Sequence, residues 1–319
     1  MEHVFTSGYL PLDQTSVWLR GNHHGHSTRS DGEDDPFEIV SAYEASGYAY
    51  LALSEHDLFV DPQVYQPNTA MTILPAVEIT SIANQTLMYL GAGPEIPAAN
   101  ALSLPQISDF VLARGGLFIV DHPNWLYQSP KRHATLEELL VVPNLAAIEI
   151  YTGVIERLPG NPHALEVWDG LLTAGRKVFG HAVDDQHNKV DRFLGWNCVQ
   201  WPAGVPIRSD GIIDALFKGS FYASTGVTIR RLGVSEDGQS IVIESDAEEI
   251  RWRVRDGMLA DVTEGGDGRL PIGNLPNLDR LNSSWRRMDT PGDAIYVRAE
   301  LAGPKGRYAW TQPFFIATR

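Results

Sequence analysis

Residues 17 to 225 alternate between short apolar runs and amphipathic segments, and this alternation constrains the fold more than any other feature of the chain. The apolar runs have the length of β-strands and lie at 17–23, 48–54, 72–79, 86–91, 117–121, 146–151, 178–181 and 196–200. Helical patterns separate them at 36–46, 104–114, 135–140, 163–174 and 210–218. Strand–helix alternation of this kind predicts an α/β fold with a parallel sheet or barrel.

From about residue 226 the character of the sequence changes. The segments become short, alternate apolar with polar residues, and are rich in Val, Ile and aromatic residues, as in IRWRVRD and YAWTQPFFI. This pattern predicts a small antiparallel β-domain of sandwich type. The stretch 263–293 is rich in Gly, Pro and Asn and is predicted to be a long loop. We therefore expect two domains, a barrel at 1–225 and a β-sandwich-like domain at 226–319.

Charge and hydropathy narrow the classes of partner. The 319 residues carry a formal net charge of −15, which argues against nucleic acid and against an anionic membrane surface as partners. A small anionic substrate stays possible, because bound divalent metals would reverse the local field.

The chain shows no apolar run of membrane-spanning length and no signal-peptide pattern, so we expect a cytoplasmic protein. The one cysteine, Cys198, is expected to be a buried thiol. The oligomeric state stays open.

Half of the 10 histidines lie, with acidic residues, where apolar runs give way to loops. These residues are His24, His26 and Asp31 in HHGHSTRSDG, His56 in SEHD, Glu78 in PAVEIT, His122 in VDHP, and Asp185 with His187 in DDQH. Residues two apart on an extended strand project from one face, so His24 and His26 can reach the same metal. Because α/β barrels build their sites at the carboxyl ends of their strands, the set predicts a multi-metal hydrolytic centre.

The order of these blocks resembles the PHP family (polymerase and histidinol phosphatase domain) over about residues 18 to 225, and the HxHxxxSDG spacing is specific to it. The resemblance implies a distorted seven-stranded (β/α) barrel with two or three divalent metals at its mouth. It also implies a ligand set: His24, His26, Glu78 and Asp185 for a first metal, Glu78 and His122 for a second, and Asp31, His56 and His187 for a third. The tail resembles one branch of the family, which includes a carbaryl hydrolase.

Two positions depart from the family pattern. Family members usually have Asp before the histidine of the second block, where this chain has Glu55. The remaining ligand of the second metal has no clean match. Glu149 in AIEIYTG is the candidate for it, with a role in orienting another ligand as the alternative.

Other residues near the predicted strand ends have two interpretations each. His181 could act as a proton shuttle or ligand, or it could simply line the barrel. Together with Asp185, we take His181 and Arg29 as the candidate catalytic residues. The predicted loops also carry cationic side chains that could bind phosphate oxygens or could simply face solvent: Arg29, Lys131, Arg132, Arg157 and Arg192. Trp125 and Tyr151 could form an apolar wall for a substrate or pack beneath a loop.

Mixed imidazole and carboxylate ligands favour Zn, Mn or Fe over Mg or Ca. Two such cations would lower the pKa of a bridging water and supply a hydroxide at about pH 7, so we predict a metal-dependent hydrolase without a covalent protein nucleophile. The favoured function is a phosphoesterase acting on a small phosphomonoester or phosphodiester. The alternatives are a carboxylic ester or carbamate hydrolase and, third, a non-catalytic carbohydrate- or protein-binding protein. A phosphoesterase needs fixed cations beside the metals, whereas an aryl ester needs an apolar pocket.

Overall fold

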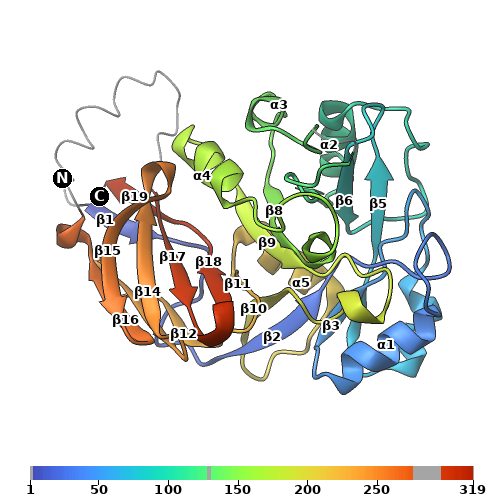
Figure 1. The fold of residues 1–319 in the computed structure, drawn as a ribbon. Helices are drawn as coiled ribbons and strands as arrows, with labels where there is room; N and C mark the ends of the chain where they lie inside the picture. Colours follow the sequence, from blue (N-terminus) through green and yellow to red (C-terminus); the bar gives the residue numbers. More distant parts are fainter. Residues whose placement is uncertain (1–2, 128–130, 276–295, 319) are drawn as a thin grey trace.

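The computed structural model describes residues 3–127, 131–275 and 296–318, and it has the mixed α/β fold that the sequence predicts (Figure 1). The α-helices of the described residues are α1 (Pro36–Ala45), α2 (Leu104–Leu112), α3 (Leu136–Leu140), α4 (Leu165–Thr173) and α5 (Ser209–Lys218). Short 3₁₀ turns occur at η1 (Pro62–Val64), η2 (Gln66–Asn68), η3 (Gly153–Glu156), η4 (Lys189–Asp191), η5 (Arg255–Gly257), η6 (Ile272–Asn274) and η7 (Pro304–Gly306). Each α-helix overlaps a predicted helical segment.

Two sheets contain the strands of the first part of the chain. One includes β2 (Ser16–Asn22), β3 (Tyr50–Ala52), β4 (Thr72–Leu74), β10 (Trp196–Pro202) and β11 (Phe221–Ser224). The other consists of β5 (Ala76–Thr80), β6 (Thr86–Leu90), β7 (Leu117–Val120), β8 (Ala147–Thr152) and β9 (Phe179–Val183), in that order. The strands β2–β3–β4 and β7–β8–β9 run parallel, whereas β6 and β10 are antiparallel to their neighbours. A closed, seven-stranded barrel is therefore not confirmed.

Local chemistry explains where these elements begin and end. Helix α1 begins after Asp35, whose side chain accepts a hydrogen bond from the Phe37 N–H at 2.8 Å, and Pro36 occupies its first turn. The predicted strand 72–79 is divided into β4 and β5 at Pro75, which has no N–H for a sheet hydrogen bond. The apolar faces of α2 and α4 pack against the five-stranded sheet and form the largest buried cluster with it.

The second part of the chain is antiparallel. Its strands are β12 (Ile229–Val234), β13 (Ser240–Ser245), β14 (Glu249–Val254), β15 (Met258–Glu264), β16 (Asp267–Pro271), β17 (Tyr296–Ala302), β18 (Tyr308–Thr311) and β19 (Phe314–Thr318). Strands β12, β13 and β16 form a separate sheet that packs on β14 and β17 through one apolar cluster. The prediction of a loop at 263–293 is wrong at its start: β16 pairs with β13 there, and Leu270 is buried in that cluster. The rest of that stretch, from residue 276, lies outside the described residues.

Strands from the two parts share one sheet. The N-terminal strand β1 (His3–Thr6) pairs with β19, and β11 pairs with β18, so the 11-stranded sheet continues across residue 225. Figure 1 shows β1 beside the C-terminal strands, away from the helices α1 and α2. The domain boundary at residue 225 stays a prediction.

None of the helices in the described ranges has the length and apolar character that crossing a membrane requires.

Candidate metal centre

The predicted ligands come from separate segments that meet at one edge of the fold. His24 and His26 follow β2, His56 follows β3, His122 follows β7, and Asp185 follows β9. Because β2–β3 and β7–β9 are parallel sets, their carboxyl ends bring these side chains together. Isolated bridges between Gly25 and Gln186, and between His56 and Glu78, hold the segments side by side. Glu78 lies in the middle of β5 rather than at its end.

One group consists of four buried ligand atoms: His24 Nε2, His26 Nε2, Glu78 Oε2 and Asp185 Oδ1. His24 Nε2 lies 3.1 Å from the Glu78 oxygen and 3.2 Å from the Asp185 oxygen, and His26 Nε2 lies 3.0 and 3.2 Å from the same two atoms. Metal–ligand bonds of about 2.0–2.2 Å place the ligands of a tetrahedral ion roughly 3.3–3.5 Å apart. The four atoms are therefore spaced as the ligands of one transition-metal ion would be.

The orientation of these atoms supports the same interpretation. Both ring nitrogens of His26 and Oδ1 of Asp185 are buried and have no hydrogen-bond partner among the described residues, although oppositely polar atoms lie close by. An unpaired buried polar group is costly, so such atoms call for an explanation. His24 Nε2 is within hydrogen-bond distance of Glu78 Oε2, at 3.1 Å, but a cation shared by the group would satisfy the unpartnered Nε2 of His26 and Oδ1 of Asp185 as well. The residues present thus fit a divalent metal.

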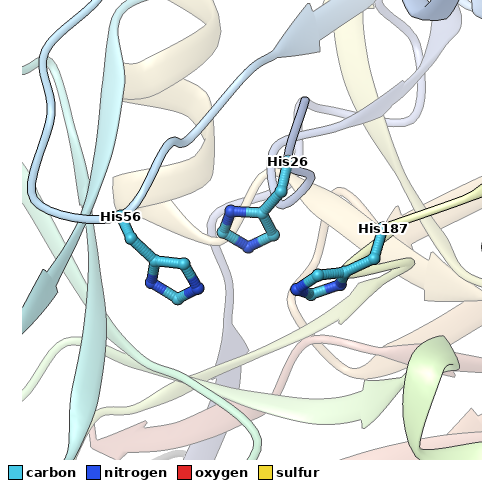
Figure 2. Close-up of side chains that lie close together, drawn as sticks. All are labelled: His26, His56 and His187. Atoms are coloured by element: carbon cyan, nitrogen blue, oxygen red, sulfur yellow. The ribbon is translucent and has the colours of Figure 1, made fainter. Parts of the chain in front are cut away.

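A second group lies beside the first and is more open to solvent. It contains His56 and His187, whose Nε2 atoms each lie 3.4 Å from Asp31 Oδ2. Figure 2 shows the rings of His56 and His187 on either side of His26, facing a common space, and their centroids lie 4.4 and 4.6 Å from that of His26. A neutral imidazole offers one lone pair, so His26 can serve only one of the two groups. Asp31, His56 and His187, the ligands predicted for the third metal, are the residues left for another cation.

His122 lies on the opposite flank. Its Nε2 is 3.6 Å from Glu78 Oε1 and 3.7 Å from Asp185 Oδ2, the oxygens that the first group leaves free. Its backbone has φ of +27°, an unfavourable value for a non-glycine residue. Glu149, the candidate partner for this flank, points elsewhere. Its Oε1 is 2.6 Å from His24 Nδ1, and its Oε2 accepts hydrogen bonds from the His122 N–H and from Thr152 Oγ1, both at 2.8 Å.

The pKa values of the histidines in the centre reflect the several buried carboxylates around them. Burial lowers the pKa of His24, but Asp185, Glu149 and Glu78 more than offset it, and the net pKa lies well above its usual range. Burial also lowers the pKa values of His56 and His187. Glu78, Asp31 and Asp185 nevertheless raise the pKa of His56 to about 9, and Asp31 and Asp185 raise that of His187 to about 9. The centre thus favours positive charge, which divalent cations would supply.

Two acidic residues of the centre have contacts that the sequence did not reveal. Asp121, directly before His122, joins His24 and Glu149 in a third buried group, and burial together with the Glu149 charge raises its pKa well above the usual value. The one feature of the sequence that could have pointed to Asp121 is its place beside the predicted ligand His122 in the VDHP block. Glu55 accepts hydrogen bonds from Ser27 Oγ and Ser30 Oγ, both at 2.5 Å, and so holds the loop that carries Asp31.

The other two candidate catalytic residues are His181 and Arg29. His181 is fully buried in β9, and its ring centroid lies 5.0 Å from that of His23. Neither of its ring nitrogens has a hydrogen-bond partner in the part of the chain that the structure describes. It belongs to none of the groups of close ligand atoms in the described residues. Arg29 is exposed on the loop after His26.

Three of the five loop cations are paired with carboxylates: Arg132 with Glu166, Arg157 with Asp191, and Arg192 with Asp34. Arg29 and Lys131 form no ion pair with any of the described residues. Aromatic rings lie beside the His122 flank, where the centroids of Trp125 and His133 are 5.0 and 4.5 Å from that of His122. Tyr151 is instead buried against His163, with their ring centroids 5.1 Å apart.

Comparisons with known proteins identify the fold. No protein-family model matches the chain, and no curated protein does. The chain is similar in fold to a solved two-domain protein from Bacteroides vulgatus ATCC 8482 that contains a predicted PHP-like metal-dependent phosphoesterase. This PHP-like fold is the one that the order of the sequence blocks predicted. The Bacteroides structure matches with a TM-score of 0.53 and 15% identity, over 94% of this chain and 96% of that one. PsfC from Pseudomonas syringae PB-5123 matches with a TM-score of 0.44 and 14% identity, over 61% of this chain and 87% of that one. At these identities the likeness shows the fold alone.

Proposed function

We propose that this protein is a metal-dependent hydrolase of small molecules, and that phosphate monoesters or diesters are its first substrate class. The observation that carries the proposal is the group of four buried ligand atoms from His24, His26, Glu78 and Asp185, which lie 3.0–3.2 Å apart across its imidazole–carboxylate pairs. The Bacteroides structure of the same fold contains a predicted metal-dependent phosphoesterase, which supports the choice of reaction.

The chain's own residues have distinct parts in this proposal. One cation would be held by His24, His26, Glu78 and Asp185. Another would be held by Asp31, His56 and His187. The remaining predicted ligand pair, Glu78 and His122, lies on the flank between Trp125 and the first group. Zn, Mn or Fe suit such ligands. When bound, these cations polarise the substrate and lower the pKa of water. The burial of the first group excludes bulk solvent from one side of the centre.

Charge beside the centre supports an anionic substrate only in part. The ammonium of Lys131 and the guanidinium of Arg29 are exposed and have no carboxylate partner within the described ranges, so either can face a phosphate oxygen. The other three loop cations are already neutralised by Glu166, Asp191 and Asp34.

The aromatic rings beside His122 favour a second candidate, the hydrolysis of a carboxylic ester or carbamate. Trp125, Tyr127 and His133 lie within one cluster, with Trp125 4.9 Å from Tyr127 and 5.5 Å from His133 between ring centroids. Such a surface can pack against a flat apolar group. It needs no cation.

Parallel assays separate the two candidates. Protein loaded with Zn or Mn would be given p-nitrophenyl phosphate, bis(p-nitrophenyl) phosphate, p-nitrophenyl acetate and an aryl carbamate, with Asp185→Asn as the matched control. We expect metal-dependent release of p-nitrophenol from at least one of the two phosphate esters, and no such release by the control. Turnover of only the ester or carbamate would replace the phosphoesterase proposal with the second candidate. Metal binding without turnover of any substrate would favour a binding protein.

A further inference from the structure

His24 lies between two sets of carboxylates. Its Nε2 faces Glu78 Oε2 and Asp185 Oδ1 at 3.1 and 3.2 Å, whereas its Nδ1 lies 2.6 Å from Glu149 Oε1. All four side chains are buried. A neutral imidazole has one N–H and one lone pair, so the partner of one nitrogen decides what the other can do. If Glu149 accepts the Nδ1 proton, the lone pair of Nε2 points into the four-atom group.

The hydrogen bonds of Glu149 account for both of its oxygens. Oε1 faces the His24 ring, and Oε2 accepts from the His122 N–H and from Thr152 Oγ1, both at 2.8 Å. The carboxylate therefore links the ring of one predicted ligand to the backbone of another. That backbone is the one with φ of +27°, which needs support from its surroundings.

We infer that Glu149 is a positioning residue that fixes the His24 ring with Nε2 free for the metal and anchors the backbone of His122, and that it is not itself a metal ligand. This inference rests on the proposed metal centre. Ligating histidines commonly donate their second ring N–H to a carboxylate, which sets the tautomer and raises the basicity of the ligand. The competing arrangement is a cation held by His24 Nδ1, Asp121 and Glu149, whose atoms also lie close together.

Glu149→Gln tests the inference with metal affinity as the readout. The amide keeps the size of the side chain but has only one oxygen, while His24, His122 and Thr152 together present three donors to it. Thr152→Val is the matched control, because it removes one bond to Oε2 and leaves the contact with His24.

Zinc binding to the metal-free proteins would be measured by competition with a chromophoric chelator. We expect Glu149→Gln to weaken zinc affinity by about 10- to 100-fold with an unchanged number of zinc equivalents. Thr152→Val should change it by less than about fivefold. Loss of a whole equivalent in Glu149→Gln would make Glu149 a ligand and overturn the inference. Unchanged affinity in that variant, or an equal loss in both variants, would overturn it as well. Wild-type protein that binds no zinc would instead refute the proposed metal centre.

A second measurement reads the tautomer of His24 in the wild-type protein and needs a variant only to assign the signals. In zinc-loaded protein with ¹⁵N-labelled histidine, the ring signals of His24, assigned by their loss in His24→Asn, should show a protonated Nδ1 and a metal-bound Nε2. A metal-bound Nδ1, or a proton on Nε2, would contradict the inference.

Discussion

A buried ion pair links helix α4 to strand β17, and its removal should destabilise the whole chain. Arg298 donates to Asp169 through Nε at 2.8 Å and through Nη2 at 2.6 Å, and the Tyr296 hydroxyl donates to Asp169 Oδ1 at 3.0 Å. The side chains of Arg298 and Asp169 are 2% and 8% exposed. We consider Arg298→Met, which keeps the length of the side chain and removes its charge.

The structure sets the size of the effect. In this variant the Asp169 carboxylate stays buried, loses two charge-assisted hydrogen bonds and keeps only the one from Tyr296. Breaking a buried pair by removing one partner costs about 3–5 kcal/mol, because an uncompensated charge is left behind. For a chain of 319 residues that corresponds to a fall in Tm of roughly 5–8 °C, at about 2.1 cal/mol/K of unfolding entropy per residue. Replacing both partners, in Arg298→Met with Asp169→Leu, should recover most of the loss.

Urea unfolding followed by circular dichroism and tryptophan fluorescence would measure these free energies. The control is Arg230→Met, which breaks an ion pair to Asp267 whose side chains are 54% and 69% exposed. It should cost less than about 1 kcal/mol. If Arg298→Met were no more destabilising than the control, or if the double replacement were simply additive, the reasoning about the buried pair would be refuted.

Two further predictions concern the metal centre, and a third concerns a buried carboxylate of β17. Replacing His26 or Asp185 with Ala should abolish hydrolysis and remove at least one metal equivalent while the β-strand signal in circular dichroism is kept; turnover retained in both variants would rule the assignment out. Glu55→Gln should weaken metal binding by the Asp31, His56 and His187 group more than by the first group, since the Ser27 and Ser30 hydroxyls lose a carboxylate acceptor; in a zinc titration, equal affinities for wild type and variant would disprove this. Burial raises the pKa of Glu300, but Arg298 and Arg253 more than offset burial, so its net pKa lies below the ordinary 4.5. A lowered pKa in the folded protein contributes stability above the ordinary pKa that is lost as the pH falls below it, so Glu300→Gln should lose about 1–3 kcal/mol at neutral pH and show a weaker acid dependence than wild type in urea unfolding. A parallel acid dependence in the two proteins would contradict this.

Much of the first part of the fold was predictable because its strands are buried and therefore strongly apolar. LFIV and AIEIYT could hardly lie anywhere but in the core, and β7 and β8 form there. The antiparallel direction of β6 also had a signal, since the five residues between Thr80 and Thr86 are too few for a parallel crossover. The pairing of β1 with β19 had none, because it joins segments at opposite ends of the chain.

The ligand positions could be predicted from the ends of strands, but the directions of side chains could not. His24 and Asp185 meet because parallel strands end at one edge. Whether Glu149 faces a metal or the back of His24 depends on a hydrogen bond of 2.6 Å that no spacing encodes. The same holds for Arg157, whose loop position fits a phosphate contact but whose guanidinium binds Asp191.

The central claim is that the His24, His26, Glu78 and Asp185 group holds a transition metal, with Asp31, His56 and His187 holding another. Elemental analysis of protein purified without chelators, then repeated after incubation with Zn or Mn and removal of excess metal, tests it most directly. The account predicts about two tightly held equivalents per chain, with at least one fewer in Asp185→Ala. A folded, stable wild-type protein that retains no metal after this treatment would contradict it.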